Sequence, residues 1–435
     1  MAQIPMRAQS NMDKYRAFKV ELKPMPAQIE KIEQTMGVCR FVFNLFISEN
    51  QRRRNEAIAQ TPEGEKPKAT FMGGYEFSKW FNNEWRAANP DKSWVQDVSS
   101  KAVKHSIMNA DSAYRKFLAG KAGFPKYKRR YGKPVGVYLP RNGKDLVVQR
   151  HRAKIPTIGW VRFKEFGYVP YNTVPVSVTI SREAGRYFAA FLFKAASKAQ
   201  MIQAEKSDGL GVDMGINVQA AVSDGRMYEN INKTPRVKKL KKRLKREQRK
   251  LSRKLECNRK NLKTEVEAAT NTHTGTSAHT PKGTRPKAVA GTGSNVAKQR
   301  RKLQKAHRRL TCVRRDYLNK IAAELVSKNP AFITIEDLNV KGMMKNHHLA
   351  RSIAECEFYY FRMVLTQKCH EYGIELRVVD RWYPSSKTCS VCGAVKHDLK
   401  LSDRAYECLV CGTVNDRDYN AAVNLKQCKK FAATA

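Results

Sequence analysis

The sequence is poor in acidic residues and contains no long hydrophobic run. Only 39 Asp and Glu residues accompany 83 Lys and Arg residues, which gives a formal net charge of +44. Such an excess indicates a polyanionic partner, either nucleic acid or an anionic membrane. The longest apolar runs, such as YFAAFLF at residues 187–193, are far shorter than the roughly 20 residues of a membrane-spanning helix, so nucleic acid is the favoured partner.

The N-terminus also lacks the apolar core of a signal peptide, so we expect a cytoplasmic protein. In that compartment the ten cysteines are not expected to form a disulfide framework. We expect clustered cysteines to bind a metal ion and scattered cysteines to be buried and reduced. The scattered cysteines are Cys39, Cys257, Cys312, Cys356, Cys369 and Cys428.

The N-terminal half combines strand patterns with one helical region. Residues 15–24 alternate apolar and charged positions, which predicts a strand that ends at a proline. Helical spacing follows and extends to about residue 118. Further on, 174–180 and 186–194 flank a turn that contains Gly185, which predicts a hairpin. We infer a small β-barrel-like domain with a helical domain inserted into it.

The C-terminal half alternates strands and helices, which predicts an α/β domain. Residues 208–225 indicate two strands around a tight turn, and 331–338 and 374–380 indicate further strands. A helix is expected over 352–372. Between the first strands and the rest, two basic segments with an apolar stripe predict an antiparallel helical hairpin. Its Thr-, Gly-, Ala- and Ser-rich insert, 264–297, is expected to be a mobile loop.

Three acids occupy comparable places in this domain. Asp213 and Glu336 each end a predicted strand, and Asp418 lies just before a segment with a helical pattern. Strand ends and helix starts converge on one edge of an α/β sheet, where sites form. Carboxylates gathered there suit Mg²⁺ or Mn²⁺, and two such ions about 4 Å apart can clamp the oxygens of a phosphodiester. The sequence therefore predicts a metal-dependent site that acts on nucleic acid.

Each acid taken singly has a structural alternative as a turn or helix-cap residue. Asp416, for example, is a candidate cap for the helix after it. Asp380, at the end of another predicted strand, is either a decoy or an auxiliary ligand. The residues alone do not decide between Asp416 and Asp418 as the third acid.

Two cysteine pairs give the strongest local signal. The spacing CxxC-x15-CxxC is typical of a zinc ribbon, in which each pair supplies two thiolates from one tight turn. Four sulfurs close a tetrahedral site and leave no open position, so we expect a structural Zn²⁺ and not a reactive one. The four ligands are Cys389, Cys392, Cys408 and Cys411.

These segments together resemble the TnpB family of transposon-encoded RNA-guided DNA endonucleases and its descendants, the compact type V CRISPR effectors. Similarity to the opening segment and to a later linker of the family extends the match over most of the chain, and the low-complexity insert is its least typical part. The segments are GVDMGINVQAAVSDG (211–225), ITIEDLNVKGMMKN (333–346), the four cysteines, DRDYNAAVNL (416–425), residues 18–44 and GFPKYK (123–128).

The resemblance implies a multidomain α/β plus β-barrel fold. The α/β domain would be a RuvC-like nuclease of the RNase H fold, with a zinc-ribbon insertion, and a β-barrel wedge domain would carry an inserted helical recognition domain. The implied boundaries are 1–24 with 121–205 for the wedge domain, 25–120 for the recognition domain, 206–380 with 412–435 for the nuclease domain, 235–328 for its helical hairpin and 381–411 for the zinc ribbon.

The resemblance also implies a function. Asp213, Glu336 and Asp418 match the catalytic triad of the family, which selects Asp418 over Asp416. The protein would cleave target double-stranded DNA next to a short flanking motif, with Mg²⁺ or Mn²⁺ and a guide RNA from a transposon end or a CRISPR array, and would act in the prokaryotic cytoplasm on nucleoid DNA. Base pairing between the guide RNA and the target strand would recognise the target sequence, while the protein would recognise the shape of the backbone and the flanking motif.

Several basic and aromatic residues are candidates for nucleic-acid contacts, because phosphate contacts dominate affinity and bases stack on aromatic rings. For Tyr127 and Tyr131, packing within the small barrel is an equally good interpretation. The candidates are Lys126, Tyr127, Lys128, Arg129, Arg243 and Arg417.

Other functions remain open at this stage. The alternatives are a nuclease-inactive RNA-guided repressor, a compact type V CRISPR effector with the same chemistry, a transposase that joins strands, and a general nucleic-acid-binding protein with a zinc ribbon. The presence of all three acids argues against the nuclease-inactive repressor. A general nucleic-acid-binding protein would give these acids no role. The sequence does not decide between a monomer and a dimer.

Overall fold

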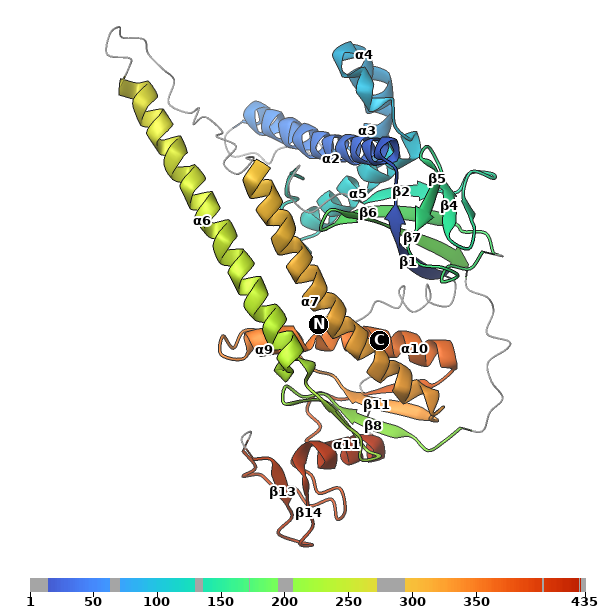
Figure 1. Cartoon of the computed structure of the whole chain (residues 1–435), viewed down its shortest axis with the longest axis vertical. Helices are drawn as coiled ribbons and strands as arrows, with labels where there is room; N and C mark the ends of the chain where they lie inside the picture. Colours follow the sequence, from blue (N-terminus) through green and yellow to red (C-terminus); the bar gives the residue numbers. More distant parts are fainter. Residues whose placement is uncertain are drawn as a thin grey trace. The chain divides into compact units, whose positions relative to one another are not determined.

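The computed structural model of the chain divides into two compact units (Figure 1). One lies within Ser10–Ala196 and the other within Ser197–Ala435. No helix among the described residues combines the length and the hydrophobicity needed to cross a membrane. The described residues are 15–62, 71–129, 136–171, 173–194, 206–271, 294–400, 403–429 and 431.

A seven-stranded antiparallel sheet, in the order β2-β6-β7-β1-β5-β4-β3, forms one layer of the N-terminal unit. The predicted first strand lies at its centre, where Phe18 is opposite Phe191. The predicted hairpin of β6 and β7 is confirmed, and Gly185 in its turn has a φ of +77° that favours glycine. Barrel-like closure stays a prediction. The strands are β1 (Tyr15–Lys23), β2 (Val137–Pro140), β3 (Val147–Val148), β4 (Arg152–Ile155), β5 (Gly159–Phe163), β6 (Ser177–Glu183) and β7 (Arg186–Lys194).

Helices α2 and α5 pack together and connect two apolar cores of this unit. On α2, Ile32 belongs to the core beneath the sheet, whereas Phe46 belongs to a helical core rich in aromatic rings. The helical pattern expected to about residue 118 is confirmed. The elements are α2 (Pro26–Gln60), α3 (Gly74–Trp80), the π-helical turn η1 (Phe81–Trp85), α4 (Arg86–Ala88), the 3₁₀ turn η2 (Pro90–Val95) and α5 (Ser100–Leu118).

A five-stranded mixed sheet, in the order β10-β9-β8-β11-β12, forms the centre of the C-terminal unit. Strands β8, β11 and β12 are parallel, and β9 and β10 continue the sheet antiparallel. This arrangement confirms the expected alternation of strands and helices. The strands are β8 (Leu210–Asp213), β9 (Val218–Val222), β10 (Met227–Glu229), β11 (Phe332–Glu336) and β12 (Glu375–Val379).

Two long helices form the predicted antiparallel hairpin, in which Gln299 Nε2 donates to Glu247 Oε2 at 2.7 Å. The expected loop 264–297 is partly wrong, because α6 continues to Asn271 and α7 already begins at Ser294. The rest of the insert lies outside the described residues. The expected helix 352–372 is also wrong as one element, since Glu357, with a φ of +50°, divides it. The helices are η3 (Ile231–Lys233), α6 (Pro235–Asn271), α7 (Ser294–Ser327), α8 (Val340–Met343), α9 (Ala350–Cys356) and α10 (Phe358–Tyr372).

The last part of the chain forms a small two-stranded sheet and a helix. Strand β13 (Ala405–Glu407) pairs with β14 (Val414–Asp416), and α11 (Arg417–Gln427) follows without a break. The small sheet thus extends past residue 411, where the sequence-based boundary of the ribbon was placed.

Candidate metal centres

Asp213 and Glu336 lie at the same edge of the five-stranded sheet. Each is the last residue of its strand, and the residues just before them, Val212 and Ile335, lie opposite each other in the parallel pair β8–β11. Parallel strands in register end at the same level, so both carboxylates leave the sheet together. Part of each side chain remains open to solvent.

Helix α11 brings the third acid to this edge. A Cβ atom on Gly211 would lie 2.0 Å from the carbonyl oxygen of Ala422, so the helix rests directly on the backbone of β8. Asp418 is buried in the first turn of α11, and not before the helix as the sequence suggested. Asp416 is the N-cap and accepts hydrogen bonds from the backbone N–H groups of Asp418 (2.9 Å) and Tyr419 (3.1 Å), as its structural alternative predicted.

The other two acids act electrostatically on Asp213. Burial raises the pKa of Asp213 well above its usual value, and the charges of Glu336 and Asp418 raise it further, while Arg417 opposes them. Burial also raises the pKa of Glu336, against a hydrogen bond from Ser385 that lowers it. Repulsion of this kind is what a bound hard cation offsets, so the donor set fits Mg²⁺ or Mn²⁺.

The carboxylates are spread more widely than ligands of a single ion. Within the part of the chain that the structure describes, only the four cysteines form a group of three or more His, Cys, Asp or Glu side chains close enough to hold one ion. Two ions about 4 Å apart need ligands distributed around both, which suits the wider spacing of the acids.

Sequence reasoning missed a set of polar residues that supports this site. The Ser385 hydroxyl donates to Glu336 Oε1. Asn424 Nδ2 in turn donates to the carbonyl oxygens of Ser385 (2.8 Å) and Thr388 (2.6 Å), and Asn420 Nδ2 donates to that of Thr388 (2.7 Å). Both asparagines are buried. Their spacing of four residues, which places them on one helix face, was the available signal.

Two neighbouring acids have other partners. Asp337, beside Glu336, is held by ion pairs of 2.7 Å with Arg362 and Arg381. Asp380 accepts a hydrogen bond of 2.9 Å from the backbone N–H of Trp382 in the turn after β12. This is the role of a turn residue, in line with its interpretation as a decoy.

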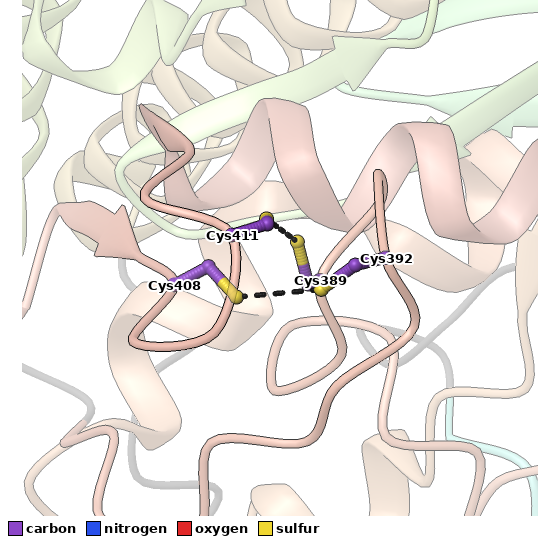
Figure 2. A group of neighbouring side chains, drawn as sticks. All are labelled: Cys389, Cys392, Cys408 and Cys411. Atoms are coloured by element: carbon purple, nitrogen blue, oxygen red, sulfur yellow. Dashed lines mark hydrogen bonds between the residues drawn. The ribbon is translucent and has the colours of Figure 1, made fainter.

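The four cysteines converge between the two knuckles of the ribbon (Figure 2). Their Sγ atoms all lie within 4.8 Å of one another, with 3.7 Å between Cys389 and Cys411 and 3.5 Å between Cys392 and Cys408. Tetrahedral zinc with Zn–S bonds of about 2.3 Å places its sulfurs about 3.8 Å apart. The donor set therefore fits Zn²⁺.

The pKa values of these thiols differ from one cysteine to another. Hydrogen bonds from the Thr413 hydroxyl and backbone lower the pKa of Cys411 to about 6, which favours the thiolate that a metal binds. A backbone hydrogen bond from Ala394 lowers the pKa of Cys392, but hydrogen bonds with the other thiols raise it to about 12. Of the scattered cysteines, Cys257 and Cys312 are exposed, which corrects the expectation that all of them are buried. Both lie on the highly charged hairpin helices.

The candidate nucleic-acid contacts at 126–129 are exposed and are fixed to α2. Lys128 N–H donates to Asn44 Oδ1 at 2.7 Å, and the Tyr127 hydroxyl donates to Gln51 at 3.1 Å. Tyr127 is 46% exposed, so it is not a core residue of the sheet. Tyr131 lies outside the described residues.

The other candidates lie in the C-terminal unit. Arg243 lines a basic hollow of about 490 Å³ on the helical hairpin, together with Lys239, Arg246 and Arg309. Arg417 donates to Asp418 Oδ1 at 3.2 Å, so it belongs to the acid site.

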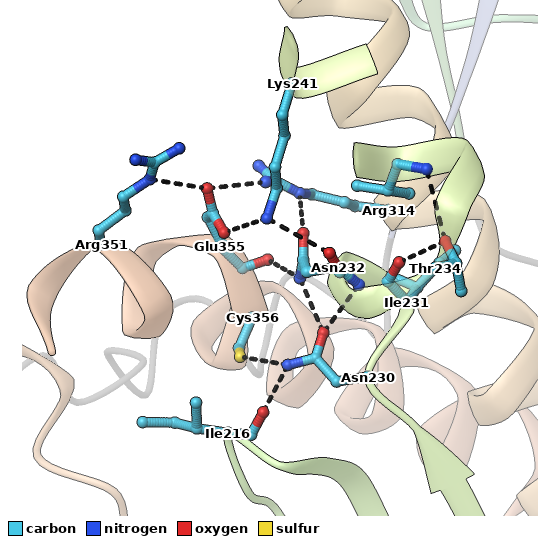
Figure 3. A network of polar contacts seen from close by, with 11 residues as sticks. Ile216, Asn230, Ile231, Asn232, Thr234, Lys241, Arg314, Arg351, Glu355 and Cys356 are labelled. Atoms are coloured by element: carbon cyan, nitrogen blue, oxygen red, sulfur yellow. Dashed lines mark hydrogen bonds and ion pairs between the residues drawn. The ribbon is translucent and has the colours of Figure 1, made fainter. Parts of the chain in front are cut away.

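A buried polar network joins the base of the hairpin to the loop after Asp213 (Figure 3). Asn230 Nδ2 donates to the carbonyl oxygen of Ile216 at 2.6 Å. Asn232 donates to the Glu355 carbonyl oxygen at 3.0 Å and accepts from Arg314 at 2.7 Å. The network thus reaches Ile216, which lies three residues after Asp213.

Three family sequence models match parts of the chain. They are described as "Cas12f1-like, TNB domain" (residues 358–425), "Helix-turn-helix domain" of OrfB_IS605 (residues 12–58) and "Probable transposase" OrfB_IS605 (residues 284–347). In the second match, this chain forms strand β1 and the single helix α2 and not a helix-turn-helix.

Two relatives match almost the whole chain. A Streptomyces pristinaespiralis protein named "Putative RNA-guided DNA endonuclease" is 30% identical over 418 residues, 94% of this chain and 88% of its own. InsQ of Escherichia coli (strain K12), named in the same way, is 28% identical over 429 residues, 95% of this chain and 92% of its own. "TnpB-like protein L79" of Acanthamoeba polyphaga mimivirus is 40% identical over 134 residues, 29% of this chain and 25% of its own.

Similarity to solved structures is low. The cryo-EM structure of the Cas12f1-sgRNA-target DNA complex has a TM-score of 0.33 and 12% identity, covering 95% of this chain and 98% of its own. The structure of the mini-RNA-guided endonuclease CRISPR-Cas_phi3 has a TM-score of 0.40 and 11% identity, and the match covers 95% of this chain and 92% of its own. The sequence matches, above all the 30% identity over 88% of the Streptomyces protein, establish that this chain belongs to the TnpB family.

Proposed function

We propose that this chain is a guide-RNA-dependent endonuclease that hydrolyses target double-stranded DNA next to a short flanking motif. The names of its two full-length relatives support the guided activity. The observation that carries the reaction is geometric: Asp213 and Glu336 end neighbouring parallel strands in register, and α11, which rests on β8, carries Asp418 in its first turn. A structural role leaves three mutually repelling acids unexplained.

Asp213, Glu336 and Asp418 would be the ligands that hold Mg²⁺ or Mn²⁺ at this edge of the sheet. Bound ions would supply an activated water and stabilise charge on the phosphodiester. The chain's own residues orient the ligands, because Ser385 fixes one oxygen of Glu336 and Arg417 one oxygen of Asp418. We propose the RuvC-like RNase H fold for this arrangement, with the domain boundaries given above except that the small sheet of the ribbon continues to Asp416.

The cysteine cluster would hold a structural Zn²⁺. Its four thiolates fill the tetrahedral coordination of the ion, so no position remains for water or substrate. Asn420 accepts a hydrogen bond from the backbone N–H of Ser390 in the first knuckle, and Asn424 donates one to the carbonyl oxygen of Thr388 just before it. These bonds connect the knuckle to the acid-bearing helix, so zinc would affect cleavage only by ordering the structure.

Guide RNA and target DNA would occupy the basic surfaces. In the hollow on the hairpin, positively charged side chains lie close together, namely Lys239, Arg243, Arg246 and Arg309. Phosphate contacts of this kind make binding strongly salt-dependent. The exposed segment 126–129 would add contacts from the N-terminal unit.

Cleavage of a labelled duplex that matches the guide tests the proposal. The protein is purified with its RNA, the RNA is sequenced, and cleavage is measured in Mg²⁺ with and without it. Asp213→Ala should lose cleavage, whereas Asp380→Ala, which removes an acid at the end of the neighbouring strand β12, should retain it. Unchanged cleavage by Asp213→Ala refutes the acid assignment. Binding without cleavage by the unaltered protein supports a repressor, and strand joining supports a transposase.

A further inference from the structure

An apolar hollow of about 350 Å³ opens beside the acid site. Glu336 forms part of its wall, and most of the remaining lining is hydrophobic or aromatic. Met214, Leu338, Tyr359 and Met363 contribute to it. Hollows of this size and character suit a flat organic group with few polar contacts.

Part of the wall comes from the segments that carry two of the acids, Asp213 and Glu336. Met214 directly follows Asp213, and Leu338 lies two residues after Glu336. Because Glu336 itself lines the hollow, a group bound there lies beside the acid site.

The charges at the hollow suit an anionic strand. Lys341 lines it and is exposed, so its ammonium group is available to a backbone phosphate. The nearby carboxylate of Asp337 is paired with Arg362 and Arg381, so its charge is compensated.

Tyr359 offers the stacking surface. It is the second residue of α10, and its side chain is 54% exposed although it lines the hollow. An exposed ring beside an apolar hollow can stack on any base, because every base has a π-face.

We propose that this hollow receives an unstacked nucleobase of the DNA strand being cut, next to the scissile phosphate, with Tyr359 stacked upon it. The inference rests on the proposed nuclease function and adds a substrate subsite to it. A paired base enters only after leaving its duplex, which costs unstacking energy. The subsite thus favours strands that have already been separated by guide pairing.

An abasic scan across the cleavage point tests this subsite in the RNA-loaded protein. Target strands carry one abasic nucleotide at successive offsets from the scissile phosphate. Cleavage should slow at one offset by about 5- to 150-fold, the range that corresponds to one stacked base. Tyr359→Ala should slow cleavage of the intact strand by a similar factor and remove the dependence on offset. Tyr359→Phe, which keeps the ring, should restore both.

Tyr372→Ala is the matched control, because Tyr372 is also an exposed tyrosine of α10 but lies at its other end. It should behave as the unaltered protein. Equal rates at every offset, or equal loss in both alanine variants, overturn the subsite.

A binding measurement separates this subsite from the proposed function. Single-stranded DNA with 2-aminopurine at the sensitive offset, or at each offset in turn, is bound in Ca²⁺ in place of Mg²⁺. Quenching that disappears in Tyr359→Ala supports the subsite even if the protein does not cleave DNA. Equal quenching in Tyr359→Ala and the unaltered protein overturns it even if cleavage is normal.

Discussion

The side-chain oxygen of Asn420 accepts a hydrogen bond of 2.9 Å from the backbone N–H of Ser390, which lies between Cys389 and Cys392. Asn420 is two residues after Asp418 on the same helix. The cysteine knuckle and the third acid are therefore connected through one buried side chain. The two candidate metal sites share no ligand, but the same helix, α11, carries Asp418 and holds the cysteine knuckle through Asn420.

Replacement of Asn424 by alanine should weaken this connection. It removes two hydrogen bonds and leaves the carbonyl oxygens of Ser385 and Thr388 without that donor, at a cost of about 1–3 kcal/mol. The Mg²⁺ concentration for half-maximal cleavage should rise, because Ser385 also orients Glu336. A metal titration of cleavage measures this. Asn109→Ala, on an exposed helix position in the other unit, should change neither value.

Removal of one zinc ligand tests the same connection from the other side. Cys408→Ser should lose bound zinc, measured by elemental analysis, and should weaken cleavage without altering any catalytic acid. Cys312→Ser is the matched control, since Cys312 is exposed and outside the cluster. Full cleavage activity together with demonstrated zinc loss would count decisively against coupling of the ribbon to the acid site.

Asp213→Asn should stabilise the metal-free protein while it abolishes cleavage. Burial and the charges of Glu336 and Asp418 raise the pKa of Asp213, so the ionised side chain is unfavourable in the folded state. The amide removes that repulsion, and each kcal/mol gained should raise Tm by roughly 2–4 °C. Thermal unfolding without added Mg²⁺ or Mn²⁺ measures the gain. Added Mg²⁺ should raise the Tm of the unaltered protein more than that of the variant, and a lower Tm for Asp213→Asn without Mg²⁺ would contradict the repulsion.

Gly211→Ala should displace the helix that carries Asp418. The added Cβ would meet the Ala422 carbonyl oxygen at 2.0 Å and the Lys426 nitrogen at 2.5 Å, within the backbone of α11. Overpacking costs about 1–3 kcal/mol or more, and backbone atoms yield less than side chains. We expect strongly reduced cleavage with zinc content retained. Gly136→Ala, where the nearest atom would be 3.4 Å away, should be tolerated.

The sequence predicted much of the candidate site, because the pattern of apolar residues shows where a strand ends. The strand patterns that end at Asp213 and Glu336 predicted two strands, and the structure pairs these strands in parallel with both acids at one edge. The cysteine spacing predicted a cluster, because each pair lies in one local turn. The sequence could not place Ser385, whose role depends on a contact with Glu336 that is 49 residues away.

The errors in the fold have similar physical causes. Glu357 adopts a left-handed backbone conformation that non-glycine residues rarely adopt, and its carboxylate is paired with Arg315 of α7 at 2.9 Å. Such a break depends on tertiary contacts and leaves no local pattern. The Thr- and Gly-rich composition of the insert predicted a loop. Its first residues, 264–271, also contain Glu and Ala, which favour helix, and α6 includes them.

The network in Figure 3 should make stability depend on pH through Glu355. Burial alone would raise the pKa of Glu355, but its pairing with Lys241, Arg351 and Arg314 lowers the pKa below the usual 4.5. A depressed pKa means that the contribution is fully present above the unfolded value and is lost as pH falls through the folded value.

Replacement of Glu355 by glutamine, which keeps the shape and removes the charge, isolates this contribution. At neutral pH the variant should be less stable by about 1–2 kcal/mol, a value reduced by partial solvent screening. The difference in Tm should shrink as the pH falls below about 4.5, where Glu355 protonates in the unfolded chain, and should vanish once the pH is below the lowered pKa of the folded protein. Thermal unfolding across this range measures it, with Glu84→Gln on the other unit as control. A difference that stays constant with pH would show that the ion pairs with Lys241 and Arg314 do not hold the hairpin base.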